Sequence, residues 1–245
     1  MLPVLQIGPI AVQVPGLVLL LGLWTGLNLA ERYTKPRGVE PNLLYNLVFI
    51  ALIAGIIGAR LAYIVRYPQA FAQSPTSLFS LNPGLLDPIG GAAIGIIAGI
   101  IYGQRKKLPL LPTLDSLTPL LAVMALANGL AHLASGAAFG YESQLPWAFD
   151  LWGARRHPTQ IYEIITAASL LVIFWPGRSI ILRWHPGMYF LAFCACSAAS
   201  ALFLGAFRAD SALLDYGIRS GQLAAWAILA LTLFALGRLL KKLEE

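Results

Sequence analysis

The chain has 245 residues, of which 58% are hydrophobic and only 11% are charged, and its mean hydropathy is +0.72. A soluble globular domain carries about 25% charged residues, so this composition excludes one and predicts a protein that crosses a membrane several times. The formal net charge of +6 does not indicate nucleic-acid binding, because the basic residues lie in short segments between apolar runs.

Residues 1–14 are interrupted by Pro3, Gly8 and Pro9 and are too short to span a bilayer. They have neither a basic region nor a small-residue cleavage site, so no signal peptide is predicted. Seven apolar runs follow, and each approaches the roughly 20 residues that a transmembrane helix needs. These runs are 16–30, 43–65, 85–103, 117–139, 160–175, 188–206 and 221–240. No linker is long enough for a second domain, so we predict an all-α fold in which residues 1–245 form a single bundle of seven transmembrane helices.

The basic residues predict the orientation of this bundle. One side of the membrane receives all the lysines together with several arginines (Arg32, Lys35, Arg37, Arg105, Lys106, Lys107, Arg178, Arg183, Arg238, Lys241, Lys242). The other side receives arginines only (Arg66, Arg155, Arg156, Arg208, Arg219). Because positive loops stay in the cytoplasm, we expect the N-terminus outside and the C-terminus in the cytoplasm.

The densest polar cluster beside a long apolar run is WGARRHPTQIYE, residues 152–163. Pro158 suits the first turn of a helix, where its missing N–H costs nothing. Thr159 and Gln160 lie four and three residues before Glu163, so the three side chains share one helix face. One interpretation is a helix start wetted by the membrane interface, and the other is a functional site at the outer surface.

Ionisable residues at membrane depth are costly and therefore informative. Arg60 has two interpretations: it ties helices together by pairing with Glu163 or Asp87, or it receives a lipid phosphate together with an outer arginine (Arg155, Arg156 or Arg208). A guanidinium suits the second task because it holds phosphate oxygens with two donors. His132, in the fourth run, is either a hydrogen-bonded core histidine or a base.

The string HPTQIYE, residues 157–163, resembles the HP[ST]Q-[LI]-YE signature of the prolipoprotein diacylglyceryl transferases, which are integral membrane enzymes of bacteria. Further stretches agree in the family's order. They are LQIGPIAVQVPG at 5–16, the helix 42–65 with Gly58, Arg60 and Tyr63, GGAAIG at 90–95, SGAAFG at 135–140 and FRADSALLDYGIRSGQ at 207–222. The resemblance covers essentially the whole chain.

The resemblance implies transfer of a diacylglyceryl group from phosphatidylglycerol to the lipobox cysteine of a prolipoprotein, with release of glycerol phosphate, at the bacterial cytoplasmic membrane. The expected partners are phosphatidylglycerol, the prolipoprotein signal peptide and other subunits of a membrane complex, and no nucleic acid, cofactor or metal ion is expected. The expected catalytic residues are His132, His157 and Glu163. The expected substrate-binding residues are Arg60, Tyr63, Arg156, Gln160, Tyr162 and Arg208.

The chain departs from the family where the reaction needs charge. The thiol must lose its proton, and the departing phosphate needs fixed cations. The positions of the family's tyrosine, histidine, arginines, asparagine and glutamates are here Pro15, Ile89, Gly129, His132, Ala137, Ala201 and Gly205. Two functions therefore remain open. One is a weakened transferase whose site is rebuilt from Arg60, His132, His157, Glu163 and the outer arginines, and the other is a catalytically degenerate, lipid-binding structural subunit of a larger membrane complex.

Overall fold

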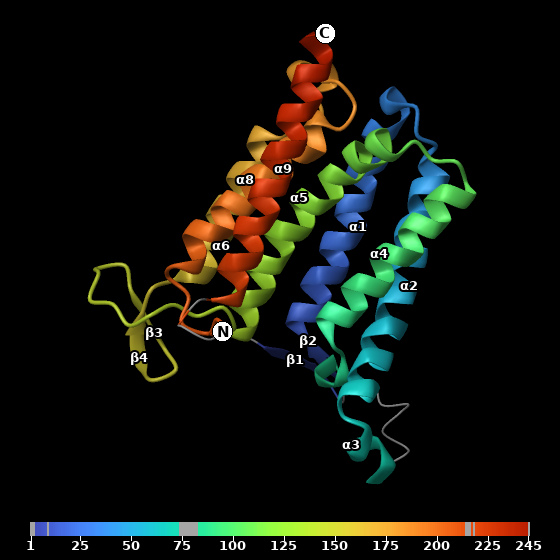
Figure 1. Ribbon diagram of the computed structural model, residues 1–245. Helices are drawn as coiled ribbons and strands as arrows, with labels where there is room; N and C mark the ends of the chain where they lie inside the picture. The colour runs from blue at the N-terminus through green and yellow to red at the C-terminus, as the bar shows by residue number, and fades with distance from the viewer. Residues whose placement is uncertain (1–2, 9, 74–82, 214–216, 218, 245) are drawn as a thin grey trace. The chain divides into compact units, whose positions relative to one another are not determined.

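The computed structural model describes residues 3–8, 10–73, 83–213, 217 and 219–244 (Figure 1). Most of these residues are helical, as the sequence predicts. They divide into two compact units, one formed by Met1–Arg37 with Leu114–Glu245 and the other by Gly38–Thr113. The prediction of a single bundle domain therefore stays a prediction.

The unit Gly38–Thr113 is built on two long helices, α2 (Pro41–Arg66) and α4 (Pro88–Arg105), which pack against each other. The short elements α3 (Pro68–Gln73) and η3 (Pro83–Leu85) lie between them in the chain. Each long helix carries proline in its first turn, where no intrahelical N–H bond is lost. Their backbones touch at glycine, since a Cβ on Gly91 would lie 2.8 Å from the Cβ of Ala59 and 2.9 Å from the carbonyl oxygen of Gly55.

The start of α4 is held by Asp87. Its Oδ1 accepts the backbone N–H of Gly90 at 2.8 Å, and its Oδ2 pairs with Arg66 Nη1 at 3.2 Å. The Gly90 N–H and the Arg66 guanidinium together lower the pKa of the Asp87 carboxyl.

The other unit contains the remaining helices. They are α1 (Val14–Thr34), η1 (Lys35–Arg37), α5 (Leu110–Ser135), α6 (Thr159–Ile173), α7 (Ser179–Leu182), α8 (Met188–Gly205) and α9 (Ser220–Glu244). The first turn of α5 belongs to the unit Gly38–Thr113. Helix α8 packs along α9 and against α6 (Figure 1). Its aromatic core centres on Tyr189, which is fully buried beside Phe174 and Phe193 and donates its hydroxyl hydrogen to the Phe174 carbonyl at 2.7 Å.

Near the start of α5 this unit buries an ion pair that the sequence analysis did not single out. Arg37 Nη1 lies 3.1 Å from Asp115 Oδ2, and the guanidinium also lies over the Tyr189 ring. The Asp115 carboxylate accepts the backbone N–H groups of Gly187 and Phe190, each at 2.8 Å. It thereby supplies hydrogen-bond acceptors at the first turn of α8, and it ties α5 to α8 and to η1.

Two short antiparallel hairpins differ from the all-α prediction. Strands β1 (Val4–Ile7) and β2 (Ile10–Gln13) pair before α1, and β3 (Phe149–Leu151) and β4 (Ala154–Arg156) pair before α6. The second hairpin closes through Trp152 and Gly153, which both have positive φ, 54° and 77°. This turn gives the strands the twist of a two-residue hairpin, which hydrophobic periodicity alone does not reveal.

Five helical segments are long and apolar enough to cross a membrane: Val14–Arg37, Pro41–Arg66, Leu110–Ser135, Met188–Gly205 and Ser220–Leu243. The other two predicted runs correspond to α4 and α6, with 18 and 15 residues, and are not among them. The predicted bounds of the fourth run, 117–139, were wrong, because α5 spans Leu110–Ser135 and stops where Gly136 adopts a φ of 76°. The protein is a polytopic membrane protein, and the count of seven spans and the orientation stay predictions.

Candidate functional site

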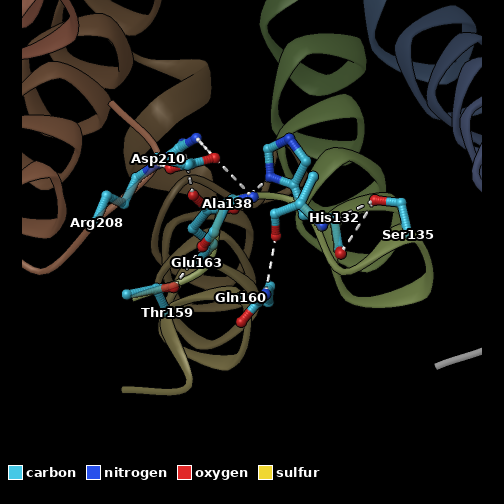
Figure 2. A network of polar contacts seen from close by, with 9 residues as sticks. His132, Ser135, Ala138, Thr159, Gln160, Glu163, Arg208 and Asp210 are labelled. Carbon is cyan, nitrogen blue, oxygen red and sulfur yellow. Dashed lines mark hydrogen bonds and ion pairs between the residues drawn. The ribbon is translucent and has the colours of Figure 1, made fainter. Parts of the chain in front are cut away.

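The signature segment 157–163 packs onto the turn that follows α5. The amide of Gln160 donates to the carbonyl of Ala137 at 2.8 Å, and the hydroxyl of Thr159 donates to the carbonyl of Ala138. The N–H of Ala138 donates to Asp210 Oδ2 at 2.9 Å (Figure 2). Thr159 and Gln160 are both fully buried. Their interpretation as residues wetted by the interface was therefore wrong, because they hold a turn.

The turn needs this support because of its backbone conformation. Ala138 is completely buried and has a φ of 55°, in the left-handed region that is unfavourable for alanine. A further bond comes from Trp152, whose indole N–H donates to the carbonyl of Gly136 at 3.1 Å. The signature thus fixes the chain between α5 and the segment that leads into the β3–β4 hairpin.

Beside the turn lies a partly buried charged network (Figure 2). Glu163 on α6 is central: its Oε2 lies 2.6 Å from His132 Nδ1 on α5, and its Oε1 lies 3.2 Å from Arg208 Nη1. Arg208 also reaches Asp210, with Nε at 3.0 Å and Nη2 at 3.1 Å from its carboxylate oxygens. The network therefore joins α5, α6 and the segment after α8.

The His132–Glu163 contact defines a chemical capability. A carboxylate accepts hydrogen bonds, so Nδ1 of His132 carries the hydrogen, and in the neutral imidazole Nε2 then keeps its lone pair. Among the described residues, no group forms a hydrogen bond with Nε2 of His132. An imidazole held in one tautomer by a carboxylate is the arrangement that general-base catalysis uses.

The charge of the network does not favour a phosphate ligand. Arg208 is shared by the carboxylates of Glu163 and Asp210. With His132 neutral, one cation faces two anions, so this network gives no net attraction to a phosphate. Among the described residues, no group of three or more His, Cys, Asp or Glu side chains is arranged to hold a metal ion.

The other predicted site residues of this unit lie close by. His157 Nδ1 lies 3.4 Å from the hydroxyl of Tyr162, which accepts the indole N–H of Trp147 at 2.8 Å. Arg156 donates to the carbonyls of Leu151 and Gly140, at 3.2 and 3.4 Å. In this structure Arg156 therefore holds backbone around the β3–β4 hairpin.

Arg60 and Tyr63 belong to the unit Gly38–Thr113. Arg60 Nη1 donates to the Leu85 carbonyl at 3.1 Å, and the Tyr63 ring lies 4.8 Å from that of Tyr67. The partners that the structure gives Glu163 are His132 and Arg208, so a pairing of Arg60 with Glu163 stays a prediction, as does a lipid phosphate at Arg60.

Comparison with known proteins places the chain in a family. The family model for prolipoprotein diacylglyceryl transferase matches residues 3–238. The chain belongs to the prolipoprotein diacylglyceryl transferase family. It is similar to the phosphatidylglycerol–prolipoprotein diacylglyceryl transferases of Nostoc sp., with 27% identity over 96% of this chain and 86% of the relative, and of Corynebacterium diphtheriae, with 25% identity over 95% and 91%. The transferase of Clostridioides difficile is 26% identical over 81% of this chain and 79% of its own length.

Two positions at which the sequence resemblance places charged residues of the diacylglyceryl transferase family are tightly packed in this chain. A Cβ on Gly129 would lie 3.1 Å from Ile164 Cγ1 and 3.2 Å from the Ile164 nitrogen. A Cβ on Gly205 would lie 2.8 Å from Gln222 Cγ. The neighbouring helices occupy the space that an arginine or glutamate side chain would need there.

The sequence did not reveal the roles of Trp152 and Asp210. Both side chains hold the turn after α5, through contacts between residues that are 16 and 72 positions apart. The FRAD string does contain Arg208 and Asp210 two residues apart, and that spacing was the available signal for their ion pair.

Proposed function

We propose that this protein acts on phosphatidylglycerol and prolipoprotein at the outer face of the bacterial cytoplasmic membrane, as a diacylglyceryl transferase whose transfer step is weakened. Its family, the activity for which its relatives are named and its apolar helices support this assignment. The observation that carries the remaining activity is the 2.6 Å contact between His132 and Glu163.

His132 takes the part of the base in this proposal. The lipobox thiol gives its proton to Nε2 of His132, and Glu163 stabilises the imidazolium that forms. The thiolate attacks the glyceryl carbon that is bonded to the phosphate of phosphatidylglycerol. A C–S bond forms as the C–O bond breaks, and glycerol phosphate departs with the bonding electrons.

The same step is slow because the leaving phosphate lacks dedicated cations. The family's arginine positions in the fourth and sixth helices are Gly129 and Ala201 here, and Arg208 is shared by two carboxylates. Loss of one group that stabilises developing charge lowers kcat by about 10²–10³. We therefore expect transfer at least about 10²-fold slower than in a member that has these groups.

A second function is favoured by a separate observation. Thr159 and Gln160 of the signature, together with Asp210, hold the turn after α5, so the fold by itself explains why these three residues are present. In this alternative the protein binds lipid without transferring it and is a structural subunit of a larger membrane complex.

One experiment separates the two. The purified protein is incubated with phosphatidylglycerol and a lipobox peptide, release of glycerol phosphate is followed beside an active family member, and the same gene is tested for growth of a bacterium depleted of its transferase. Slow release above background, with phosphatidylglycerol copurifying, supports the weakened transferase. Copurified phosphatidylglycerol with release at background supports the lipid-holding subunit, and failure to bind phosphatidylglycerol contradicts both.

A further inference from the structure

An open groove of about 590 Å³ lies between the end of α5, the start of α6, the β3–β4 hairpin and Pro3, just before β1. Its walls are mainly apolar and include Leu133, Phe149, Leu151, Trp152 and Ile161. Among the described residues that line it, Asp150 carries the only charge and Ser135 the only hydroxyl. Leu133 follows His132 on α5, and Trp152 bonds to the carbonyl of Gly136, so the groove lies beside the turn and at the same end of α5 as the charged network.

All three residues of β3 line this groove, and β3 is an edge strand. The side of β4 that faces away from β3 is already paired. There the Ser143 N–H donates to the Arg155 carbonyl and the His157 N–H donates to the Tyr141 carbonyl, each at 2.9 Å. No described residue pairs with β3 on its far side. The small sheet therefore ends at β3.

The hairpin register sets which groups of β3 face outward. Leu151 pairs with Ala154 next to the two-residue turn, and Asp150 pairs with Arg155. In an antiparallel ladder the pair next to such a turn is hydrogen-bonded and the following pair is not. The Arg155 carbonyl turns away from Asp150 to accept Ser143 N–H, as this register requires. The N–H and C=O of Asp150 thus point outward from the free edge of β3.

These features select among possible occupants. A phosphate headgroup is disfavoured, because the charge in the groove is the Asp150 carboxylate. An acyl chain would cover the polar edge of β3 without pairing its N–H and C=O. An extended peptide pairs both groups and places alternate apolar side chains against the walls. The Trp152 indole N–H is already bonded to Gly136, so its ring presents an apolar surface.

We propose that this groove binds an extended, apolar peptide that adds to the free edge of β3 as a further strand. Resting on the proposed function, the occupant is the segment of a prolipoprotein around its lipobox cysteine. Strand addition then brings the cysteine to the end of α5, where His132 lies. The backbone of Asp150 sets the register, and the apolar walls select the side chains.

The test uses the full-length protein in phosphatidylglycerol nanodiscs and a fluorescent synthetic lipobox peptide. Asp150→Pro removes the outward N–H and leaves the β3–β4 bonds in place, since Asp150 is in the pair that is not hydrogen-bonded. Asp150→Ala, the matched control, removes the same carboxylate and keeps the N–H. We expect the affinity of Asp150→Pro to be about tenfold below that of Asp150→Ala, because one net hydrogen bond is lost, with equal melting temperatures.

A second measurement checks the strand itself through the peptide. The peptides of this series each carry a single backbone N-methyl group. Affinity should fall when the methyl group is on the residue whose N–H pairs with Asp150, and it should be kept when the methyl group is on either neighbouring residue. Equal affinities of the two Asp150 variants, or no such position in the peptide series, would overturn the proposal. Quenching of tryptophan fluorescence by brominated acyl chains, if it occurs without peptide and is lost in Trp152→Phe, would also overturn the proposal. It would assign the groove to lipid. Copurification of phosphatidylglycerol, measured in parallel, tells a failure of the groove from a failure of the proposed function.

Discussion

His132 on α5 and Glu163 on α6 meet at 2.6 Å between Nδ1 and Oε2. They are 31 residues apart, and neither position alone distinguishes a buried structural residue from a base. Because the carboxylate also binds Arg208, it is oriented from both sides. The imidazole of His132 is therefore fixed in direction as well as in tautomer.

This geometry predicts the effect of His132→Asn. Asparagine can still donate a hydrogen bond toward Glu163 but cannot accept the thiol proton, so slow transfer should fall by about 10²-fold or more. Glycerol phosphate release in a single-turnover assay measures this loss. The melting temperature should change little, and His132→Ala should lower both.

Ser143→Ala is the control for this prediction, because Ser143 lies on the surface loop before the hairpin and bonds only locally through its hydroxyl. Its transfer rate should match that of the unmodified protein. Unchanged transfer in His132→Asn would remove His132 from the reaction and favour the lipid-holding function.

The buried pair Arg37–Asp115 makes an asymmetric prediction about stability. Asp115→Ala leaves a buried guanidinium whose Nε and Nη2 already have no partner among the described residues, so it should cost about 3–5 kcal/mol in the free energy of unfolding. Arg37→Ala should cost less, because Asp115 keeps the N–H groups of Gly187 and Phe190. Denaturant unfolding in detergent micelles measures both.

Arg66→Gln is the matched control for that pair. The Arg66 side chain is 64% exposed, and exposed ion pairs contribute about 0–1 kcal/mol. A loss at Arg66 as large as that at Asp115 would show that burial does not set the cost of these pairs.

Two glycines of α4 should respond in opposite ways to alanine. In Gly91→Ala the new methyl group would meet the Cβ of Ala59 at 2.8 Å and the Gly55 oxygen at 2.9 Å, so α2 and α4 must separate and the free energy of unfolding should fall. In Gly103→Ala nothing lies within 4 Å of the new Cβ, and better helix propensity should stabilise the protein by up to about 1 kcal/mol. The same unfolding measurement compares them, and equal shifts would contradict close packing at Gly91.

Much of this architecture could be predicted from the sequence, because apolar runs locate membrane helices well. The signature located the polar site and Glu163, and the ionisable residues at or near membrane depth added His132 and Arg208. It did not show that Thr159 and Gln160 would be buried against the carbonyls of residues 137 and 138. Such bonds depend on how a turn with a positive φ is placed in space, and periodicity carries no signal for that. The β3–β4 hairpin was missed because three-residue strands are too short for alternation to stand out.

The lowered pKa of Asp87 predicts a dependence on pH in the first turn of α4. The Gly90 N–H and the Arg66 guanidinium favour the charged carboxyl in the folded state, so its pKa lies below the unfolded value. The stabilisation is therefore complete above the ordinary pKa of aspartate, about 3.9, and is lost as pH falls through the folded value. Hydrogen exchange at Gly90 and Gly91 should accelerate, after correction for intrinsic rates, when the pH is lowered below about 4. Asp87→Asn should remove that dependence.

The predicted orientation gives the most direct test of the membrane assignment. The distribution of lysines places residue 106 in the cytoplasm and residue 143 outside. The two native cysteines, Cys194 and Cys196, lie within α8 and are replaced first by alanine to give a silent background. In that background Ser143→Cys should react with a membrane-impermeant maleimide in intact cells, and Lys106→Cys should react only after permeabilisation. Labelling of both positions from outside would mean an even number of spans between residues 106 and 143, and α5 could then not cross the membrane. Labelling of Lys106→Cys alone would invert the orientation, and it would place the His132–Glu163 network on the side away from the outer leaflet.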